Sequence, residues 1–371
     1  MNKPIRVIIS GGGTGGHIFP AVSIANAIKA IQPDAAIHFV GAEGRMEMHR
    51  VPAEGYTIDG LPIRGFDRKH LWKNIAVLYK IWVSQRKAKR ILKQFQPDVA
   101  VGVGGYASGP TLNKAAAMGI PCLLQEQNSY AGVTNKLLAK KASTICVAYE
   151  GMERFFPKEK IILTGNPVRQ SLLDTALTRE EAVKRIGFNP EHPVLLIVGG
   201  SLGARTLNES VIKHLQTLRE SDIQVLWQTG KYYFQELQQR VQNNNSLPDN
   251  IRMVDFISEM GTAYRAADLV VSRAGAGSIS EFCLIGKPVI LVPSPNVAED
   301  HQTKNAQALV NKQAAVMITD AEAKEKLIPT AVETIKDSRK LEDLSRHILE
   351  MALPQSAEII AKEVFKLADK S

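Results

Sequence analysis

The sequence lacks long hydrophobic runs, paired cysteines and an apolar leader. No apolar stretch approaches the roughly 20 residues that a membrane-spanning helix needs. The first four residues run directly into a strand-like pattern, without the apolar length or cleavage pattern of a secretory signal. The three cysteines, Cys122, Cys146 and Cys283, are far apart and form no CxxC pair. These absences exclude a disulfide framework and a cysteine zinc site, and they predict a cytosolic protein.

Acidic residues are almost absent from one basic stretch. The whole chain has a net charge of +9, from 46 Lys and Arg against 37 Asp and Glu. Between Arg64 and Lys93, ten Lys and Arg stand against the single acid Asp67, so this stretch alone carries +9 and the rest is balanced. A protein that binds nucleic acid over its whole surface would spread its cations. The pattern instead predicts one basic patch and no nucleic-acid partner.

Short β-branched runs alternate with helical patterns along the 371 residues, a length that favours two domains. Their nearly continuous apolar character is typical of parallel strands covered on both faces, which predicts an α/β fold. The predicted strands are 5–10, 37–41, 98–103, 120–125, 144–147, 161–164, 194–199, 223–228, 251–256, 268–272, 289–292 and 314–318. Strands 5–10 and 194–199 each end in a glycine-rich loop before a helical pattern. This repeat predicts two Rossmann-like domains in tandem.

The domain boundary is predicted at residues 165–169, Gly-Asn-Pro-Val-Arg, where glycine and proline end one series of strands. We expect residues 1–166 to form the N-terminal domain and 167–350 the C-terminal domain. The helical pattern in 351–371 is expected to pack back on the N-terminal domain.

The first glycine loop, residues 11–16, satisfies the GxGxxG pattern of dinucleotide-binding domains. With Glu43 as a ribose ligand, an NAD-dependent dehydrogenase is one interpretation. Five glycines in six residues, and His17 where the helix begins, count against it. An imidazole at that position would face an anion bound at the helix N-terminus. A histidine that only caps or packs locally is the alternative.

A second set of small and polar residues follows two strands of the C-terminal half. In segment 272–281, Ser-Arg-Ala-Gly-Ala-Gly-Ser-Ile-Ser-Glu, small residues let the backbone approach a phosphate, and Ser278 or Ser280 is expected to cap the helix. Glu281 would accept hydrogen bonds from a ribose diol. The alternative is a capping box that joins Glu281 to Ser278. Segment 300–306, Asp-His-Gln-Thr-Lys-Asn-Ala, offers further polar contacts or a solvated helix start.

Together these motifs resemble the MurG family of N-acetylglucosamine transferases. In order along residues 5 to about 310, they are GGGTGGHIFP at 11–20, QEQN at 125–128, GNPVR at 165–169, GGSLGA at 199–204, SRAGAGSISE at 272–281 and DHQTKNA at 300–306. The resemblance implies the GT-B architecture, two Rossmann-like domains facing a cleft, with the donor nucleotide mainly on the C-terminal domain. This chain departs from some members in its small segment 276–278, and loop 294–300 varies among members.

The resemblance also implies which residues contact the donor, UDP-N-acetylglucosamine. The donor sugar and pyrophosphate would lie beside Thr14, Gly15 and Gly16, with Asn128 on the N-acetylglucosamine and Gln302 on the sugar hydroxyls. Arg169 and Ser201 would meet the diphosphate, and Ile257 the uracil. Ribose and phosphate would be held by Ala276, Gly277, Ser278, Ile279, Ser280 and Glu281. No carboxylate pair of the DxD type lies beside a donor motif, so we expect no obligatory metal or other cofactor.

The implied reaction is an inverting displacement in peptidoglycan synthesis. The 4-hydroxyl of a lipid-linked N-acetylmuramyl-pentapeptide would attack the donor's anomeric carbon, converting lipid I to lipid II. His17 is the expected base because imidazole titrates near neutral pH. Glu126 is the other candidate, with a role in orienting Asn128 as its alternative. The acceptor pyrophosphate is expected on the loop Gly104, Gly105 and Tyr106.

The basic stretch supports a lipid-linked acceptor. On a helical wheel, one apolar face comprises Val77, Ile81, Ser84, Ala88, Ile91 and Phe95. The opposite face carries Leu71, Ile75, Leu78, Tyr79 and Trp82, continued by Arg86, Arg90 and Lys93. We expect Ile75, Leu78 and Trp82 to insert into an anionic membrane surface, as a peripheral protein on the cytoplasmic face of the bacterial inner membrane. A helix packed on both faces is the alternative.

Other functions fit parts of the pattern. Another GT-B UDP-sugar enzyme, such as a lipid glycosyltransferase or a UDP-N-acetylglucosamine 2-epimerase, would share the donor motifs. A dehydrogenase would leave the motifs of 272–306 without a role. A nucleic-acid binder is suggested by the charge alone and predicts steeply salt-dependent binding to DNA.

Overall fold

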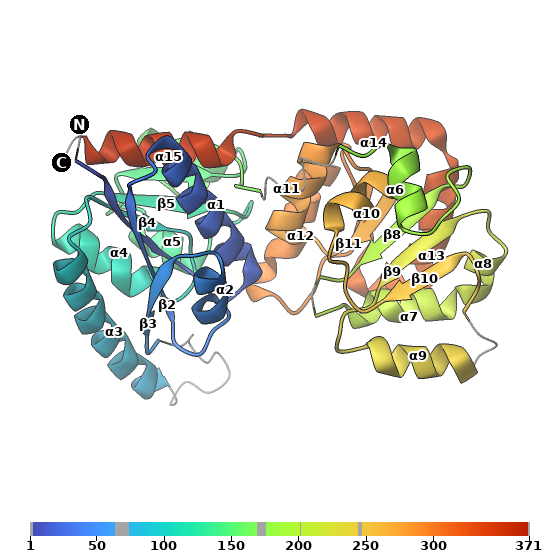
Figure 1. Cartoon of the computed structure of the whole chain (residues 1–371), viewed down its shortest axis with the longest axis horizontal. Coiled ribbons are helices and arrows are strands. Elements are labelled where there is room, and N and C mark those ends of the chain that lie inside the picture. Colours follow the sequence, from blue (N-terminus) through green and yellow to red (C-terminus); the bar gives the residue numbers. More distant parts are fainter. Residues whose placement is uncertain (1–2, 64–73, 169–175, 201, 244–246, 370–371) are drawn as a thin grey trace. The chain divides into compact units, whose positions relative to one another are not determined.

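The computed structural model describes residues 3–63, 74–168, 176–200, 202–243 and 247–369, with the backbone alone at 74–78 and 298. The chain divides into two compact units (Figure 1). Unit 1 comprises residues 1–168 and 353–371, and unit 2 comprises 169–352. The structure divides the chain at 168/169 and 352/353. Each division lies within two residues of the boundary predicted from the sequence, 166/167 and 350/351.

Unit 1 is a seven-stranded parallel sheet with helices on both faces. Its elements are β1 (Arg6–Ser10), α1 (Gly15–Ile31), β2 (Ala36–Ala42), α2 (Glu47–Ala53), β3 (Thr57–Leu61), α3 (Asn74–Phe95), β4 (Val99–Gly102), α4 (Ser108–Ala117), β5 (Cys122–Glu126), α5 (Val133–Leu138), β6 (Thr144–Val147), β7 (Ile161–Leu163) and α15 (Ser356–Ala368). The strand order is β3-β2-β1-β4-β5-β6-β7. Strand order therefore reverses between β1 and β4, which is where Rossmann-like sheets bind their ligands.

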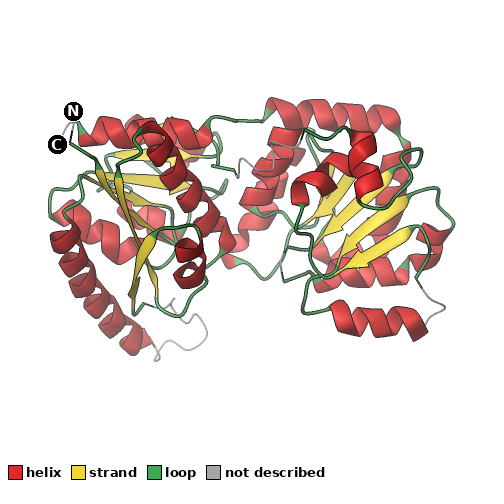
Figure 2. Ribbon diagram, viewed as in Figure 1, coloured by secondary structure: helices red, strands yellow, loops and turns green. Residues whose placement is uncertain are grey.

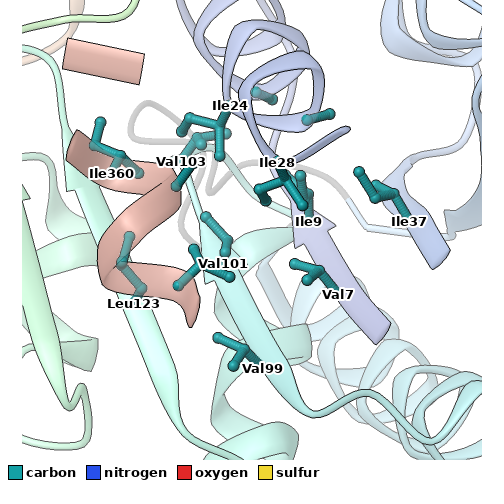
Figure 3. Close-up of a cluster of buried hydrophobic side chains, with 14 of the residues drawn as sticks. Val7, Ile9, Ile24, Ile28, Ile37, Val99, Val101, Val103, Leu123 and Ile360 are labelled. Atoms are coloured by element: carbon teal, nitrogen blue, oxygen red, sulfur yellow. The ribbon is translucent and has the colours of Figure 1, made fainter. Parts of the chain in front are cut away.

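The sheet of unit 1 is buried on both faces, which explains why its strands are apolar without alternation. Val7 and Ile9 of β1 pack in one hydrophobic cluster with α1, and Ile8 packs in the other with α3, α4 and α5. Helix α15 lies beside α1, and its Ile360 belongs to the first cluster together with Val103 and Leu123 (Figure 3). The last segment of the chain thus completes the core of unit 1.

Unit 2 repeats the arrangement with six parallel strands (Figure 2). Its elements are α6 (Arg179–Arg185), β8 (Val194–Val198), α7 (Arg205–Lys213), α8 (Leu215–Arg219), β9 (Gln224–Gln228), α9 (Phe234–Asn243), β10 (Ile251–Val254), α10 (Met260–Ala266), β11 (Leu269–Ser272), α11 (Ala276–Ile285), β12 (Val289–Leu291), α12 (His301–Val310), β13 (Val316–Met317), α13 (Asp320–Lys336) and α14 (Ser338–Glu350). The order β10-β9-β8-β11-β12-β13 matches that of the first six strands of unit 1. The predicted pair of Rossmann-like domains is confirmed.

The twelve predicted strands all correspond to strands of the structure, but β3 was missed. Its sequence, Thr-Ile-Asp-Gly-Leu, interrupts the apolar pattern with Asp59 and Gly60. It is an edge strand that pairs with β2 alone, so few apolar residues are needed there. Within the part of the chain that the structure describes, no helix is long and apolar enough to cross a membrane.

Candidate active site

The loop after β1 is glycine-rich because other parts of unit 1 occupy the space of its side chains. A Cβ atom on Gly11 would lie 2.1 Å from Cγ2 of Val103, and one on Gly12 would lie 2.2 Å from Oε1 of Glu47. Gly13 has a φ of 90°, which L side chains rarely adopt. Only glycine therefore fits this turn from β1 into α1.

The first turn of α1 follows directly from this loop. Thr14 is the N-cap residue and makes no side-chain capping hydrogen bond. Gly15 and Gly16 begin the helix and have no side chain that could cover its N-terminus. Backbone N–H groups and the helix dipole at such an end attract anionic groups. These three residues, expected beside the donor's sugar and pyrophosphate, thus lie at a position suited to phosphate.

The loop after β4 packs against the loop after β1, backbone on backbone. Gly105 has a φ of 83°, and a Cβ atom there would lie 2.4 Å from the carbonyl oxygen of Gly12. Gly104, with a φ of 90°, precedes it, and Tyr106 follows with 49% of its surface exposed. The expected acceptor loop and the first glycine loop are therefore neighbours, at the reversal of strand order.

His17 lies between these two loops. It is the third residue of α1, and its Nδ1 is 3.0 Å from the carbonyl oxygen of Gly12. A carbonyl can only accept, so this contact is a hydrogen bond when Nδ1 carries the proton, and Nε2 is then the basic nitrogen of the neutral ring. Oγ1 of Thr14 also lies 3.3 Å from Nδ1 and can accept from it. A Cβ atom on Gly104 would lie 3.0 Å from Nε2, so the ring faces the second glycine loop. The contact with Gly12 thus favours the tautomer in which Nε2 can act as a base.

Glu126 ends β5 and is only 2% exposed. Its Oε1 accepts hydrogen bonds from the backbone and side-chain nitrogens of Asn128, at 3.1 and 3.2 Å. Its Oε2 accepts from the backbone of Gly132 at 3.0 Å and from Nδ2 of Asn135 at 2.9 Å. Burial raises the pKa of the Glu126 carboxyl, and hydrogen bonds from these three residues lower it in part. Because a carboxylate has about four acceptor positions, these contacts favour the orienting role over that of a base.

A buried amide network joins the same loop to the end of unit 1. Nε2 of Gln125 donates to Oδ1 of Asn166 at 2.9 Å, and Nδ2 of Asn166 donates to the carbonyl of Gln127 at 2.9 Å. Nε2 of Gln127 donates to the carbonyl of Val103 at 2.8 Å. The motifs QEQN and GNPVR were noted in the sequence without a role for these amides. They connect the segments that follow β4, β5 and β7.

Glu47, the first residue of α2, belongs to this site although no pattern in the sequence points to it. It is 1% exposed. Its Oε2 accepts a hydrogen bond from the backbone of Gly13 at 2.9 Å, and its Oε1 accepts one from Ala42 at 3.0 Å. The partner in the glycine loop is 34 residues away in sequence. A buried carboxylate thus supports the first glycine loop from behind.

The glycine loop of unit 2 is built in the same way. A Cβ atom on Gly203 would lie 2.0 Å from the carbonyl of Thr229, and one on Gly230 would lie 2.2 Å from the nitrogen of Gly203. Asn208, which is 2% exposed, donates from Nδ2 to the carbonyl of Thr229 at 3.0 Å. Its Oδ1 accepts from Nε1 of Trp227, also at 3.0 Å. The amide of Asn208 thus supports the loop after β9, against which the glycine loop of unit 2 packs.

The start of α11 corrects one prediction from the sequence. The N-cap residue is Gly275 and makes no side-chain capping hydrogen bond, so the expected cap by Ser278 or Ser280 is wrong. The helix begins two residues before Ser278, which places both serines inside it. Oγ of Ser280 instead donates to the carbonyl of Ala276 at 3.0 Å. The small residues still leave the N-terminus of α11 uncovered by a cap, and a Cβ atom on Gly277 would point into open space.

Glu281 lies in the second turn of α11 and is half-buried. The hydroxyl of Tyr264, a residue of α10 that is 4% exposed, donates to its Oε2 at 2.9 Å. Because the N-cap is Gly275, the capping box between Glu281 and Ser278 is excluded. Tyr264 was not singled out in the sequence, and it orients the carboxylate that was expected to bind ribose.

Two further expected donor contacts lie on loops of unit 2. Ile257 is half-buried in the segment after β10. Gln302 is the second residue of α12, and its Oε1 accepts a hydrogen bond from the backbone of Ser294 at 2.8 Å. Glu299 and Asp300, just before this helix, have left-handed φ values of 58° and 52°. Gln302 therefore fixes the start of the loop that leads into α12.

Some expected site residues lie outside the described residues. Arg169 and Ser201 fall in the gaps of the described ranges, and the side chains of Ile75 and Leu78 are not described. Among the described residues, no group of three or more His, Cys, Asp and Glu side chains could hold a metal ion. The expectation that no metal is obligatory stays a prediction.

Helix α3 has the two faces that the sequence predicted. Ser84, Ala88 and Ile91 are buried against the sheet. On the other side Tyr79 is 67% and Trp82 50% exposed, so a helix packed on both faces is excluded at these positions. The guanidinium of Arg86 lies 3.7 Å from the centre of the Trp82 ring. An open groove beside it is lined by Arg86, Lys89, Arg90, Lys93 and Gln94.

Two Rossmann-like units, each with paired glycine loops at the carboxyl ends of its strands, define the GT-B class of glycosyltransferases. Residues 7–147 match the glycosyltransferase family 28 N-terminal domain, and residues 194–360 match the glycosyltransferase family 28 C-terminal domain. The chain belongs to glycosyltransferase family 28 and, within it, to the MurG family.

Relatives of known name match along the whole chain. A protein of Bacteroides fragilis is 66% identical over 99% of this chain and 97% of its own length, and one of Porphyromonas gingivalis is 54% identical over the same shares. Both are named UDP-N-acetylglucosamine–N-acetylmuramyl-(pentapeptide) pyrophosphoryl-undecaprenol N-acetylglucosamine transferase. The crystal structure of Acinetobacter baumannii MurG superposes with a TM-score of 0.77 at 27% identity, covering 98% of this chain and all of that one. A UDP-N-acetylglucosamine 2-epimerase, with a TM-score of 0.66 at 12% identity over 100% of this chain and 98% of that one, shares the fold alone.

Proposed function

We propose that this chain transfers N-acetylglucosamine from UDP-N-acetylglucosamine to the 4-hydroxyl of lipid-linked N-acetylmuramyl-pentapeptide, the step from lipid I to lipid II in peptidoglycan synthesis. The observation that carries the proposal is 66% identity over 99% of the chain to a relative named for this reaction. The glycine loops of both units add the chemistry, because a nucleotide diphosphate and an acceptor diphosphate each need such a site.

Unit 2 is the donor half of this proposal. The glycine loop after β8, with Ser201, and the N-terminus of α11 would hold the diphosphate together with Arg169, and Ile257 would contact uracil. Backbone N–H groups, a helix dipole and one guanidinium can stabilise a departing UDP without a metal ion. Glu281, oriented by the 2.9 Å hydrogen bond from Tyr264, supports binding of the ribose diol.

Unit 1 is the acceptor half and supplies the base. Nε2 of His17 would remove the proton of the attacking 4-hydroxyl while the anomeric carbon is inverted. The support for this role is the hydrogen bond from Nδ1 to Gly12, which leaves the basic nitrogen facing Gly104. Glu126, with its four hydrogen bonds inside its own loop, would hold Asn128 toward the N-acetylglucosamine. The acceptor's pyrophosphate would lie on Gly104, Gly105 and Tyr106.

Helix α3 would hold the protein on an anionic membrane surface, at the cytoplasmic face of the bacterial inner membrane. Its exposed aromatic pair, Tyr79 and Trp82, is followed by cations within three turns. Apolar side chains next to Lys and Arg suit insertion among anionic headgroups. Ile75 and Leu78, one turn earlier, belong to the same expected face.

The test is release of UDP from UDP-N-acetylglucosamine with and without a lipid-linked muramyl-pentapeptide. We expect release to depend on the acceptor and to produce a disaccharide pentapeptide in equal amount. Release of UDP without acceptor, together with formation of N-acetylmannosamine, would instead identify an epimerase. A matched acceptor in which the 4-hydroxyl is replaced by hydrogen should give no release.

A further inference from the structure

We infer that Glu47 is a positioning residue for this reaction, and that its buried carboxylate sets the orientation of His17 through the peptide group between Gly12 and Gly13. The inference rests on the proposed role of His17 as the base. Among the described residues, the carboxylate of Glu47 bonds Gly13 and Ala42, which are not among the expected donor or acceptor contacts. Its effect passes through one planar unit of the backbone.

The contacts of Glu47 fill the space behind the first glycine loop. Its carboxylate bonds the backbone nitrogens of Gly13 and Ala42, at 2.9 and 3.0 Å. A Cβ atom on Gly12 would lie 2.2 Å from Oε1 of Glu47, and one on Gly41 would lie 2.6 Å from its Cγ. Two glycines, one after β1 and one in β2, thus leave room for one carboxylate. An ordinary surface acid at the start of a helix would be solvated and would not be enclosed in this way.

The nitrogen of Gly13 and the carbonyl of Gly12 belong to the same peptide group. The nitrogen donates to Glu47 at 2.9 Å, and the carbonyl oxygen lies 3.0 Å from Nδ1 of His17. Because a peptide group is planar, fixing the direction of its N–H fixes the direction of its C=O. Glu47 therefore determines where the acceptor for the His17 ring lies.

The charge of Glu47 adds to this geometric effect. An N–H group that donates to a carboxylate is polarised, and the polarisation makes the C=O of the same peptide a better acceptor. That C=O accepts the Nδ1–H of His17, whose ring gains positive charge when Nε2 takes a proton. The series Glu47–peptide–His17 thus resembles a carboxylate–histidine pair with one peptide inserted.

A glutamine at position 47 keeps the shape of the side chain but not its function. Its NH2 group would face one of the two backbone N–H donors, because both carboxylate oxygens now accept. We expect Glu47→Gln to lower kcat by roughly 10- to 100-fold, because small misplacements of reacting groups have effects of this size. The affinity for UDP should stay within about twofold, since the proposed contacts of uracil, ribose and the leaving diphosphate lie mainly on unit 2.

Two other variants control for folding and charge. Glu47→Asp keeps the charge but is one methylene shorter, so it should retain one of the two hydrogen bonds and an intermediate kcat. It also carries the test if Glu47→Gln does not fold. Glu54→Gln makes the same change at the exposed C-cap residue of the same helix. We expect wild-type kcat and melting temperature for that control.

A double-mutant cycle with His17→Ala separates positioning from general support of the fold. If Glu47 acts through His17, Glu47→Gln should have less than a twofold further effect on kcat in the His17→Ala background. If Glu47→Gln lowers kcat equally in both backgrounds, or leaves kcat unchanged in the wild-type background, the inference is overturned. A wild-type chain that fails to release UDP with acceptor would overturn the proposed function itself, which is a separate outcome of the same assay.

Discussion

The two glycine loops of this protein share a backbone design and differ in what lies behind them. In both units the loop after the first strand packs against a neighbouring loop closely enough to exclude a Cβ atom, at Gly105 in unit 1 and Gly203 in unit 2. In unit 1 the carboxylate of Glu47 bonds the glycine loop itself, at Gly13, whereas in unit 2 the amide of Asn208 bonds Thr229 in the neighbouring loop, after β9. Both side chains are almost fully buried, at 1% and 2% exposure.

The difference teaches how one loop design can serve two kinds of chemistry. A carboxylate close behind a loop weakens its attraction for an anion and strengthens its attraction for a cation. In the proposed reaction the Glu47 carboxylate would therefore favour the imidazolium form of His17, whereas the Asn208 amide adds no charge near the diphosphate site proposed on unit 2. Under the proposed function, the two units would thus differ in the charge placed near similar backbone loops.

The largest expected effect is the loss of the proposed base of unit 1. His17→Ala should lower kcat by roughly 10²- to 10⁴-fold, the usual range for a general base, with little change in donor KM. Steady-state kinetics with saturating acceptor measure both parameters. A fall in kcat of less than tenfold, or a change in donor KM alone, would move proton removal to Glu126 or to water.

The next effect tests unit 2. Glu281→Gln should raise the donor KM by roughly 10- to 150-fold, because charged hydrogen bonds contribute about 1.5–3 kcal/mol. Tyr264→Phe removes the hydroxyl that orients Glu281 and should give a smaller change in the same direction. Titration with UDP measures affinity directly. An unchanged KM with a lowered melting temperature would show that Glu281 only stabilises the fold.

A third prediction concerns the amide behind the loop of unit 2. Asn208→Ala leaves the buried Nε1 of Trp227 and the carbonyl of Thr229 without this partner, at a cost of about 1–3 kcal/mol for each group. The unfolding free energy, measured by denaturant titration, should fall accordingly. Asn26→Ala, at an exposed position of α1 where water can replace the lost amide, is the matched control and should have little effect. A full retention of stability in Asn208→Ala would mean that the loop does not depend on its amide.

The sequence predicted the fold more completely than the site, for a physical reason. Apolar runs, glycine turns and the repeat are local patterns, so twelve of the strands and both units could be found. Glu47 could not be found, because its burial depends on a partner 34 residues away. The cap expected at Ser278 or Ser280 was wrong because a glycine already begins the helix earlier. The roles of Tyr264 and Asn208 likewise depend on packing between elements distant in sequence.

The smallest effect on catalysis is expected from the membrane face, which belongs to unit 1 but lies on α3 rather than on the glycine loops. Tyr79→Glu with Trp82→Glu should abolish binding to anionic vesicles, because exposed aromatic area is lost and two negative charges are added. Activity on a short-chain, water-soluble acceptor should stay within about twofold, since neither residue contacts the proposed base.

Ile31→Glu with Leu349→Glu is the matched control, because it makes the same charge change at apolar residues of α1 and α14 that are 45% and 52% exposed. This variant should bind vesicles nearly as the wild type does. High salt should weaken wild-type binding only in part, because screening removes the electrostatic contribution and leaves the apolar one. A folded Tyr79→Glu, Trp82→Glu variant that still sediments with vesicles would place the membrane contact elsewhere on the protein.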